Sequence, residues 1–183
     1  MKETVIKSVT IKCIMLVVLI IIYEILEYIL KINNLAFRNV IFYTFIVSCV
    51  ILSFLILIQV IKALYITAKK KTLKLYIRII SGIGSVIVTI LMISLLIYGT
   101  IIFIFTHRPE HVVEKDGKKM VAYVDSFLDV RVNYYNYVNP LVRGNKLKIN
   151  EDYGSGGYDP FKSDEIPTVK SQIYFDDNGK AIK

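Results

Sequence analysis

The sequence has few of the residues that build disulfide frameworks, metal sites and hydrolytic centres. It contains two cysteines, Cys13 and Cys49, and two histidines, His107 and His111. The cysteines lie at different depths of two apolar runs, so we expect no disulfide between them. The chain has no His-Glu-x-x-His, Gly-x-Ser-x-Gly or Cys-x-x-Cys motif. The sequence therefore predicts a protein that is not an enzyme and that uses no metal and no cofactor.

Acidic residues are scarce in the first part of the chain. Residues 1–106 hold eleven Lys and Arg but only three acids, whereas residues 107–183 hold twelve of each sign. The whole net charge of +8 therefore belongs to the hydrophobic part. Because the C-terminal part is neutral and shows no basic surface, we expect no nucleic-acid partner.

Three long runs are free or nearly free of charge, and they predict three transmembrane helices at 13–32, 39–61 and 79–105. A buried helix of a soluble protein is usually shorter and has a polar stripe. A cleaved signal peptide is the alternative for the first run, but no small-x-small cleavage site follows it.

Basic residues flank these runs unequally. The segment 1–12 carries three lysines and the segment 62–78 carries six cations, whereas only Lys31 and Arg38 lie between the first two runs. Because Lys and Arg stay on the cytoplasmic side of short loops, we expect the N-terminus and the 62–78 loop inside and residues 107–183 outside. Orientation explains the inner cluster, and lipid binding is the alternative. The cluster consists of Lys62, Lys69, Lys70, Lys71, Lys74 and Arg78.

Glu24 and Glu27 interrupt the first apolar run. Their i, i+3 spacing places both carboxylates on one face of a helix. A charge inside the bilayer costs about 2.5–3.5 kcal/mol on insertion scales, so the pair is a candidate for an ion or proton site or for a contact with a charged residue of another subunit. Alternatively, Glu27 pairs with Lys31 and both carboxylates lie near the outer headgroups.

Short alternating runs fill residues 107–183. Asp116-Gly117 between two apolar segments predicts a β-hairpin, and further strands are expected at 130–134, 147–149 and 173–175. We therefore expect a three-helix transmembrane domain over 1–106 and a small, mostly-β extracytoplasmic domain over 107–183. The β domain should have four to six strands, arranged as a sandwich or a small barrel.

Candidate binding residues lie in the C-terminal part. Tyr153 and Tyr158 flank a glycine-rich loop, where they either pack against the domain or bind a glycan or peptide. Several acids, Glu151 among them, are candidate calcium ligands. Their spacing differs from that of an EF-hand loop, which favours ordinary surface carboxylates.

Three segments carry a resemblance: 139–144 (NPLVRG), 151–154 (EDYG) and 157–161 (GYDPF). With the three predicted spans and the outer β domain, they resemble small uncharacterised multi-spanning membrane proteins of low-GC Gram-positive bacteria. The resemblance implies a location in a bacterial cell membrane and no particular activity.

The sequence thus predicts an integral membrane protein that presents its β domain to a protein or a cell-envelope component, as an accessory or immunity-type subunit. Its partners would be the lipid bilayer and another membrane or envelope protein. The alternative is a subunit of an oligomeric transporter or channel that uses Glu24 and Glu27. The oligomeric state does not follow from the sequence.

Overall fold

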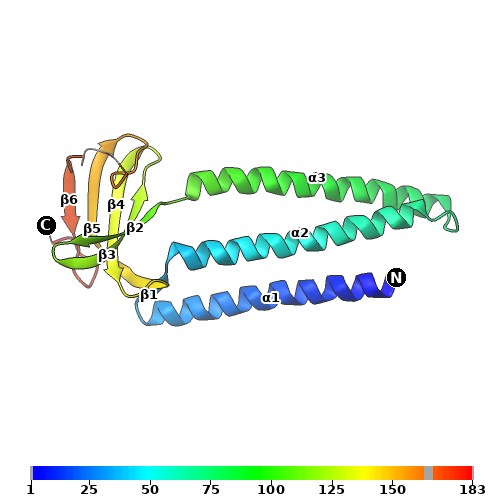
Figure 1. The fold of residues 1–183 in the computed structure, drawn as a ribbon, viewed down its shortest axis with the longest axis horizontal. Coiled ribbons are helices and arrows are strands. Elements are labelled where there is room, and N and C mark those ends of the chain that lie inside the picture. Colours follow the sequence, from blue (N-terminus) through cyan, green and yellow to red (C-terminus); the bar gives the residue numbers. More distant parts are fainter. Residues whose placement is uncertain (1, 163–166, 183) are drawn as a thin grey trace. The chain divides into compact units, whose positions relative to one another are not determined.

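Three long helices and an antiparallel sheet make up the computed structural model, which describes residues 2–162 and 167–182 (Figure 1). The helices are α1 (Lys2–Ile32), α2 (Asn39–Lys69) and α3 (Leu75–Thr106). They contain apolar stretches of 28, 31 and 31 residues, each long enough to cross a membrane. No residue in the most apolar 18-residue window of each stretch is buried, and most of the large apolar side chains of α1 and α3 are exposed. The three predicted apolar helices are confirmed.

All three helices extend beyond the charge-free runs. The segment 62–78 is mostly helical, because α2 continues to Lys69 and α3 begins at Leu75, with a short turn between them. Lysine is a good helix former and its ammonium group reaches water, so a helix does not have to end where its apolar run ends.

Contacts divide the chain into two units. The first comprises Met1–Glu24 and Thr44–Ile104, and the second comprises Ile25–Tyr43 and Phe105–Lys183. The second unit therefore contains the sheet together with the connection between α1 and α2.

Small residues allow α2 and α3 to approach closely in the first unit. A Cβ added at Gly82 would lie 3.9 Å from the Cβ of Ala68, and one at Gly84 would lie 3.6 Å from Cδ1 of Leu64. Small side chains at such positions let two helix backbones come together, as they do between transmembrane helices. Gly82 and Gly84 thus lie on the face of α3 that packs against α2.

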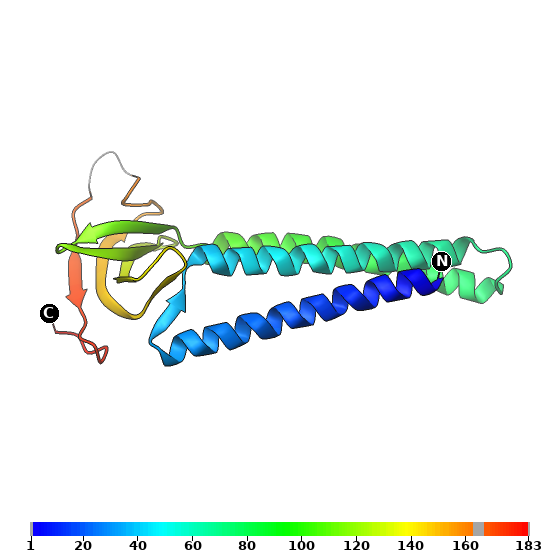
Figure 2. The ribbon, with the colours of Figure 1, turned by 60° about the horizontal axis from the view of Figure 1, so that its bottom comes forward.

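The second unit is built around a six-stranded antiparallel sheet that curls into a half-barrel (Figures 1 and 2). The strand order is β1-β5-β4-β3-β2, and β6 also pairs with β5. Residues 142–144 of β5 pair with β1 and residues 149–152 pair with β6, so the two short strands share one edge of the longest strand. The strands are β1 (Leu35–Phe37), β2 (Glu110–Lys115), β3 (Lys118–Asp125), β4 (Asp129–Tyr137), β5 (Val142–Ser155) and β6 (Ser171–Tyr174).

The predicted hairpin joins β2 and β3. Asp116 and Gly117 adopt φ values of 51° and 70°, and Lys115 pairs with Lys118 across the turn. Two consecutive residues with positive φ are what a two-residue type I′ turn requires, and Asp-Gly supplies them at low steric cost. The hairpin prediction is confirmed.

Glu110 ties the start of α2 to the sheet. Its Oε1 lies 2.6 Å from Nε and 2.5 Å from Nη2 of Arg38, and its Oε2 accepts hydrogen bonds from the Asn39 N–H (2.9 Å) and the Tyr123 hydroxyl (2.8 Å). The side chains of Arg38 and Glu110 are only 13% and 11% exposed. Because the Asn39 N–H begins α2, the carboxylate also lies at the positive end of that helix.

The core of the second unit lies on one face of the sheet. Alternate positions of β3 and β4 point toward it, as the strand period requires. The partly buried side chains of Val113, Tyr158, Phe161 and Tyr174 pack against it. The buried core residues are Met120, Ala122, Val124, Val130, Val132, Tyr134, Ile149 and Tyr153.

Candidate functional site

An open cleft lies on the core side of the sheet. Its volume is about 600 Å³, and the β2–β3 hairpin, β5, β6 and the C-terminal turn line it. Its apolar lining comes from Met120 and Ile149, which belong to the core, and from Phe175 and Ile182 of the C-terminal segment. The remaining lining is mainly polar and includes Lys115, Lys118, Lys148, Tyr174, Asp176 and Asp177.

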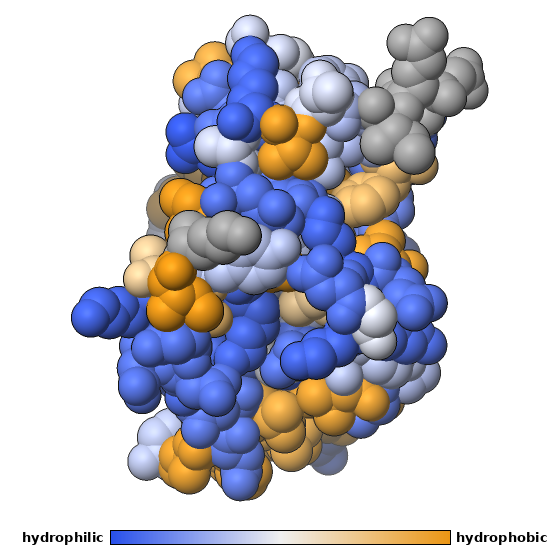
Figure 3. Space-filling view, turned by 90° about the vertical axis from the view of Figure 1, so that its left-hand side faces the viewer, coloured by the Kyte–Doolittle hydropathy of each residue, from blue (hydrophilic) through white to orange (hydrophobic). Residues whose placement is uncertain are grey.

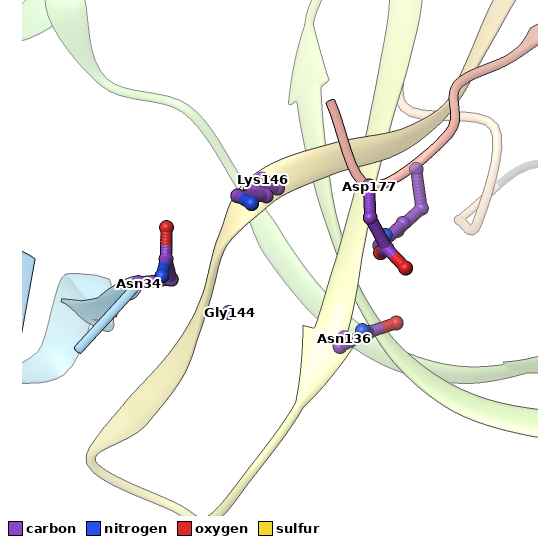
Figure 4. Close-up of a pocket in the computed structure, with 6 residues that line it drawn as sticks. Asn34, Asn136, Gly144, Lys146 and Asp177 are labelled. Carbon is purple, nitrogen blue, oxygen red and sulfur yellow. The ribbon is translucent and has the colours of Figure 1, made fainter. Parts of the chain in front are cut away.

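A smaller hollow of about 200 Å³ adjoins this cleft and shares Asn136, Lys148 and Asp177 with it. Figure 4 shows its lining, which includes Asn34 from the α1–β1 connection, Lys146 from β5 and Asp177 from the C-terminal segment. The two hollows together form the candidate site, and we call them the β-unit cleft.

Gly144 allows the strands beside the smaller hollow to approach each other. A Cβ at this position would lie 3.3 Å from the Cβ of Asn136, closer than ordinary van der Waals contact. A side chain here would therefore press on β4 and narrow the hollow.

The ammonium groups of the β-unit cleft are paired unequally. Lys148 donates to Asp177, and this hydrogen bond holds the pKa of the Asp177 carboxyl below its usual range. The charges of Lys146 and Lys118 lower that pKa further, so both lysines lie within electrostatic reach of Asp177. Among the described residues, no side-chain hydrogen bond or ion pair is formed by the ammonium group of Lys118 or of Lys146. Their charges are available to an anionic group in the cleft.

Glu151 lies beneath the cleft as a fully buried carboxylate. Its Oε1 accepts from Lys115 Nζ (2.5 Å) and Gln172 Nε2 (2.8 Å), and its Oε2 accepts from the hydroxyls of Tyr134 (2.5 Å) and Tyr153 (3.0 Å). A buried charge is tolerated only when it is paired and hydrogen-bonded, and these four donors meet that requirement. The network is structural, since no ligand could reach the carboxylate without displacing core residues.

The hydroxyls around Glu151 stay protonated. Burial raises the pKa of Tyr134 far above its usual value, and donation to Glu151 raises it further. Burial also raises the pKa of Tyr153 to about 12. Both groups therefore remain hydrogen-bond donors over the physiological pH range, as the buried carboxylate requires.

The expectation that Glu151 is an ordinary surface carboxylate is wrong. The two-residue period of a β-strand could have predicted the burial of Glu151. Ile149, Glu151 and Tyr153 lie two residues apart and so share one face of β5. The ion pair between Lys115 and Glu151 could not be predicted from the strand period, because the curl of the sheet brings β2 to Glu151.

Tyr153 and Tyr158 lie on opposite sides of the glycine-rich loop. Tyr153 is 9% exposed and belongs to the core, while Tyr158 is half-buried and packs against it. A Cβ at Gly156 would lie 2.4 Å from the Tyr158 ring, so this glycine makes room for the tyrosine. This geometry matches the packing alternative, and glycan or peptide binding by the loop stays a prediction.

Glu24 and Glu27 are both exposed on α1. No described residue forms a hydrogen bond or an ion pair with either carboxylate, and the expected pairing of Glu27 with Lys31 is not observed. The two acids therefore lie on an apolar helix without a partner from the described part of the chain.

The basic cluster of segment 62–78 surrounds the α2–α3 turn. Arg78 Nε donates to the Ala68 carbonyl (3.0 Å), which closes the turn, and Lys69 Nζ lies 4.5 Å from the centroid of the Tyr65 ring. The remaining members, Lys62, Lys70, Lys71 and Lys74, are exposed. Most of the cluster is thus exposed on the described part of the chain.

Within residues 2–162 and 167–182, no group of three His, Cys, Asp or Glu side chains converges closely enough to hold a metal ion. Comparison of the chain with protein-family models, with curated proteins and with solved structures finds no match.

Proposed function

We propose that the chain is a multi-pass protein of a cell membrane whose β unit binds a protein or a cell-envelope component outside the membrane. In this arrangement α1, α2 and α3 cross the bilayer. The N-terminus and the α2–α3 turn lie in the cytoplasm, and the β unit lies on the opposite side.

Composition and charge support the membrane part of the proposal. The three helices are long and apolar enough to span, and no residue in the most apolar window of each is buried. Nine basic residues flank the proposed cytoplasmic ends, whereas two lie in the α1–α2 connection. Such an excess retains a short loop in the cytoplasm.

The observation that carries the binding function is the β-unit cleft. It combines an apolar lining, polar groups from several strands, and the unpaired ammonium groups of Lys118 and Lys146. A concave surface of this kind, in which a few polar groups converge, is typical of binding sites. The lysines favour a partner that carries a carboxylate or phosphate group.

Neighbouring residues of β3 provide a matched test. Lys118 lines the cleft, whereas Lys119 lies over the Tyr137 ring, with its Nζ 4.3 Å from the centroid. A photo-crosslinking side chain at position 118 in the full-length protein should capture a partner in native membranes, and the same side chain at 119 should not. Lys118→Gln with Lys146→Gln should reduce capture from a third cleft position, Asn136. Equal adducts at 118 and 119 would refute binding in the cleft.

The orientation has its own test. A tag at the C-terminus should be digested by protease added to intact, wall-stripped cells. Protection of the tag under those conditions would place the β unit in the cytoplasm and overturn this part of the proposal.

The partnerless carboxylates of α1 favour a second candidate function, that of an oligomeric transport or channel subunit. Three helices seldom enclose a pathway, so Glu24 and Glu27 would line one between several copies. Proteoliposomes should then show an ion or proton flux that Glu24→Gln with Glu27→Gln abolishes while membrane insertion is retained. Absence of flux in the unaltered protein would eliminate this candidate.

A further inference from the structure

We infer that two turns of the β unit insert their apolar side chains into the headgroup–acyl boundary of the bilayer that the helices cross. The turns are 126–128 and 138–141, and we call them the apolar turns. The inference rests on the proposed membrane insertion of the helices but not on ligand binding in the β-unit cleft.

Both apolar turns expose large hydrophobic side chains. Phe127 and Leu128 are 63% and 74% exposed, and Val138 and Leu141 are 47% and 51% exposed. Exposing the apolar surface of such side chains to water costs free energy. Where several of them gather, they mark an interaction surface. The face of the β unit that carries the C-terminal segment is, by contrast, mainly hydrophilic (Figure 3).

The first apolar turn adjoins the end of α3. The Phe127 ring packs edge-on against Phe105, with centroids 5.1 Å apart, and Phe105 is among the last residues of that helix. Next to the turn, Asp125 pairs with Arg108 at 3.1 Å, which ties β3 to the segment leaving α3. Phe127 is therefore held where the chain leaves its apolar stretch.

The second apolar turn adjoins the start of α2. The Arg38 N–H donates to the Leu141 carbonyl (2.9 Å), and Arg38 Nη1 donates to the Asn139 carbonyl (3.3 Å). Since α2 begins at Asn39, this turn too lies beside the end of an apolar helix. Each of the two turns thus contacts the residues at one end of an apolar helix.

The backbone of the second turn is suited to an environment with little water. Asn139 Oδ1 accepts from the N–H groups of Leu141 and Val142 at 2.8 Å each, and the Asn139 N–H donates to the Val142 carbonyl at 3.0 Å. Pro140 has no N–H. Unpaired backbone groups are costly in lipid, and these bonds satisfy the turn internally while its side chains point outward. Leu, Val and Phe at such a position partition into the interface.

The absence of tryptophan from the chain makes the test direct. Single variants Phe127→Trp and Leu141→Trp of the full-length protein would be reconstituted in vesicles whose lipids carry bromine on the acyl chains near the headgroups. We expect blue-shifted indole emission that the bromolipids quench at both positions. Asn178→Trp, at an exposed site of the C-terminal segment outside the cleft lining, should emit as in water and resist quenching.

Leu91→Trp, in the middle of α3, separates the two proposals, and its quenching is measured with lipids that carry bromine near the ends of the acyl chains. If the indole at position 91 is quenched and that at 127 or 141 is not, the helices are in lipid and the inference is wrong. If the indole at 91 is also unquenched, the membrane proposal fails and the inference fails with it. Unchanged hydrogen exchange in β4 would show that the sheet is intact in the Phe127→Trp and Leu141→Trp variants. If exchange in β4 is faster, Leu128→Trp and Val138→Trp would be used in their place.

Discussion

Replacing the buried carboxylate with an amide is the most direct test of the network around Glu151. In Glu151→Gln the shape is kept, but a neutral group faces four donors at 2.5, 2.5, 2.8 and 3.0 Å. The best amide orientation directs its oxygen toward Lys115 and Gln172, while the two tyrosine hydroxyls turn to accept from its nitrogen. This arrangement keeps most contacts and loses the charge.

The loss can be estimated from the contacts. Hydrogen bonds to charged groups contribute roughly 1.5–3 kcal/mol and those between neutral groups roughly 0.5–1.5 kcal/mol. Four hydrogen bonds are weakened in the variant. Part of this loss is offset because the variant no longer carries the desolvation cost of a buried charge. Because the side chain of Lys115 is 28% exposed, water also compensates part of its lost ion pair. We expect the free energy of unfolding of the β unit to fall by about 3 kcal/mol.

Hydrogen–deuterium exchange of the full-length protein in nanodiscs measures this change. A loss of about 3 kcal/mol corresponds to roughly 150-fold faster exchange of protected β4 amides, when exchange follows the opening equilibrium. Asp152→Asn is the matched control. Its carboxylate lies 3.6 Å from Arg131 and is part-exposed, so the variant should lose less than about 1 kcal/mol. An increase below about fivefold in Glu151→Gln would refute the reasoning, because the carboxylate would then not hold these strands together.

Three further changes address other contacts. Arg38→Met should leave Glu110 nearly buried without its countercharge, lower the free energy of unfolding of the β unit by about 3 kcal/mol and accelerate amide exchange in β1 and β2. Gly117→Ala should lower the free energy of unfolding by about 1 kcal/mol, because φ is +70°, although a Cβ would meet no atom within 4 Å. The Lys148–Asp177 contact should stabilise the β unit above the ordinary pKa of an aspartate, and this stabilisation should be lost as pH falls through the lowered pKa of Asp177. Amide exchange in β6 should therefore be faster at acidic pH. Asp177→Asn should remove that pH dependence.

Each of these changes has a control. Arg131→Met removes an arginine that is 56% exposed with carboxylates at 3.6 Å, and its effect should stay below about 1 kcal/mol. Gly99→Ala also meets no atom within 4 Å but lies in α3, where alanine is the better helix former, so it should not destabilise the protein. Salt should weaken the pH effect at Asp177, since that carboxylate is exposed. Equal effects of a change and its control would contradict the corresponding argument.

Local features of the sequence predicted the helices and the hairpin because their causes are local. The charge-free runs mark α1, α2 and α3, and Asp116-Gly117 marks the β2–β3 turn. The helix ends were placed less well, because α2 continues through Lys62 to Lys69, where side-chain reach rather than hydropathy decides.

Features that depend on distant partners did not follow from the sequence. β1 has three residues, and its strand partner in the described part of the chain is residues 142–144 of β5, so nothing near Leu35 indicates a strand. The β-unit cleft likewise joins Asn34 to Asp177 through the curl of the sheet. The two-residue period of β5 could have predicted the burial of Glu151. Its four hydrogen-bond donors could not be predicted, because they come from β2, β4, β5 and β6.

The pairing of β1 with β5 has a consequence for biosynthesis. β1 is made between the first two helices, and its partner follows about 100 residues later, after two further helices and three strands. At roughly 5–20 residues per second, β1 waits for about 5–20 s without a partner. If the helices cross a membrane, the two strands can meet only when α2 and α3 have both inserted or have both failed to insert. A chain in which one of them fails leaves an edge of β5 unpaired, and an unpaired edge is a site for aggregation. Closure of this short ladder thus distinguishes correctly threaded chains from half-threaded ones.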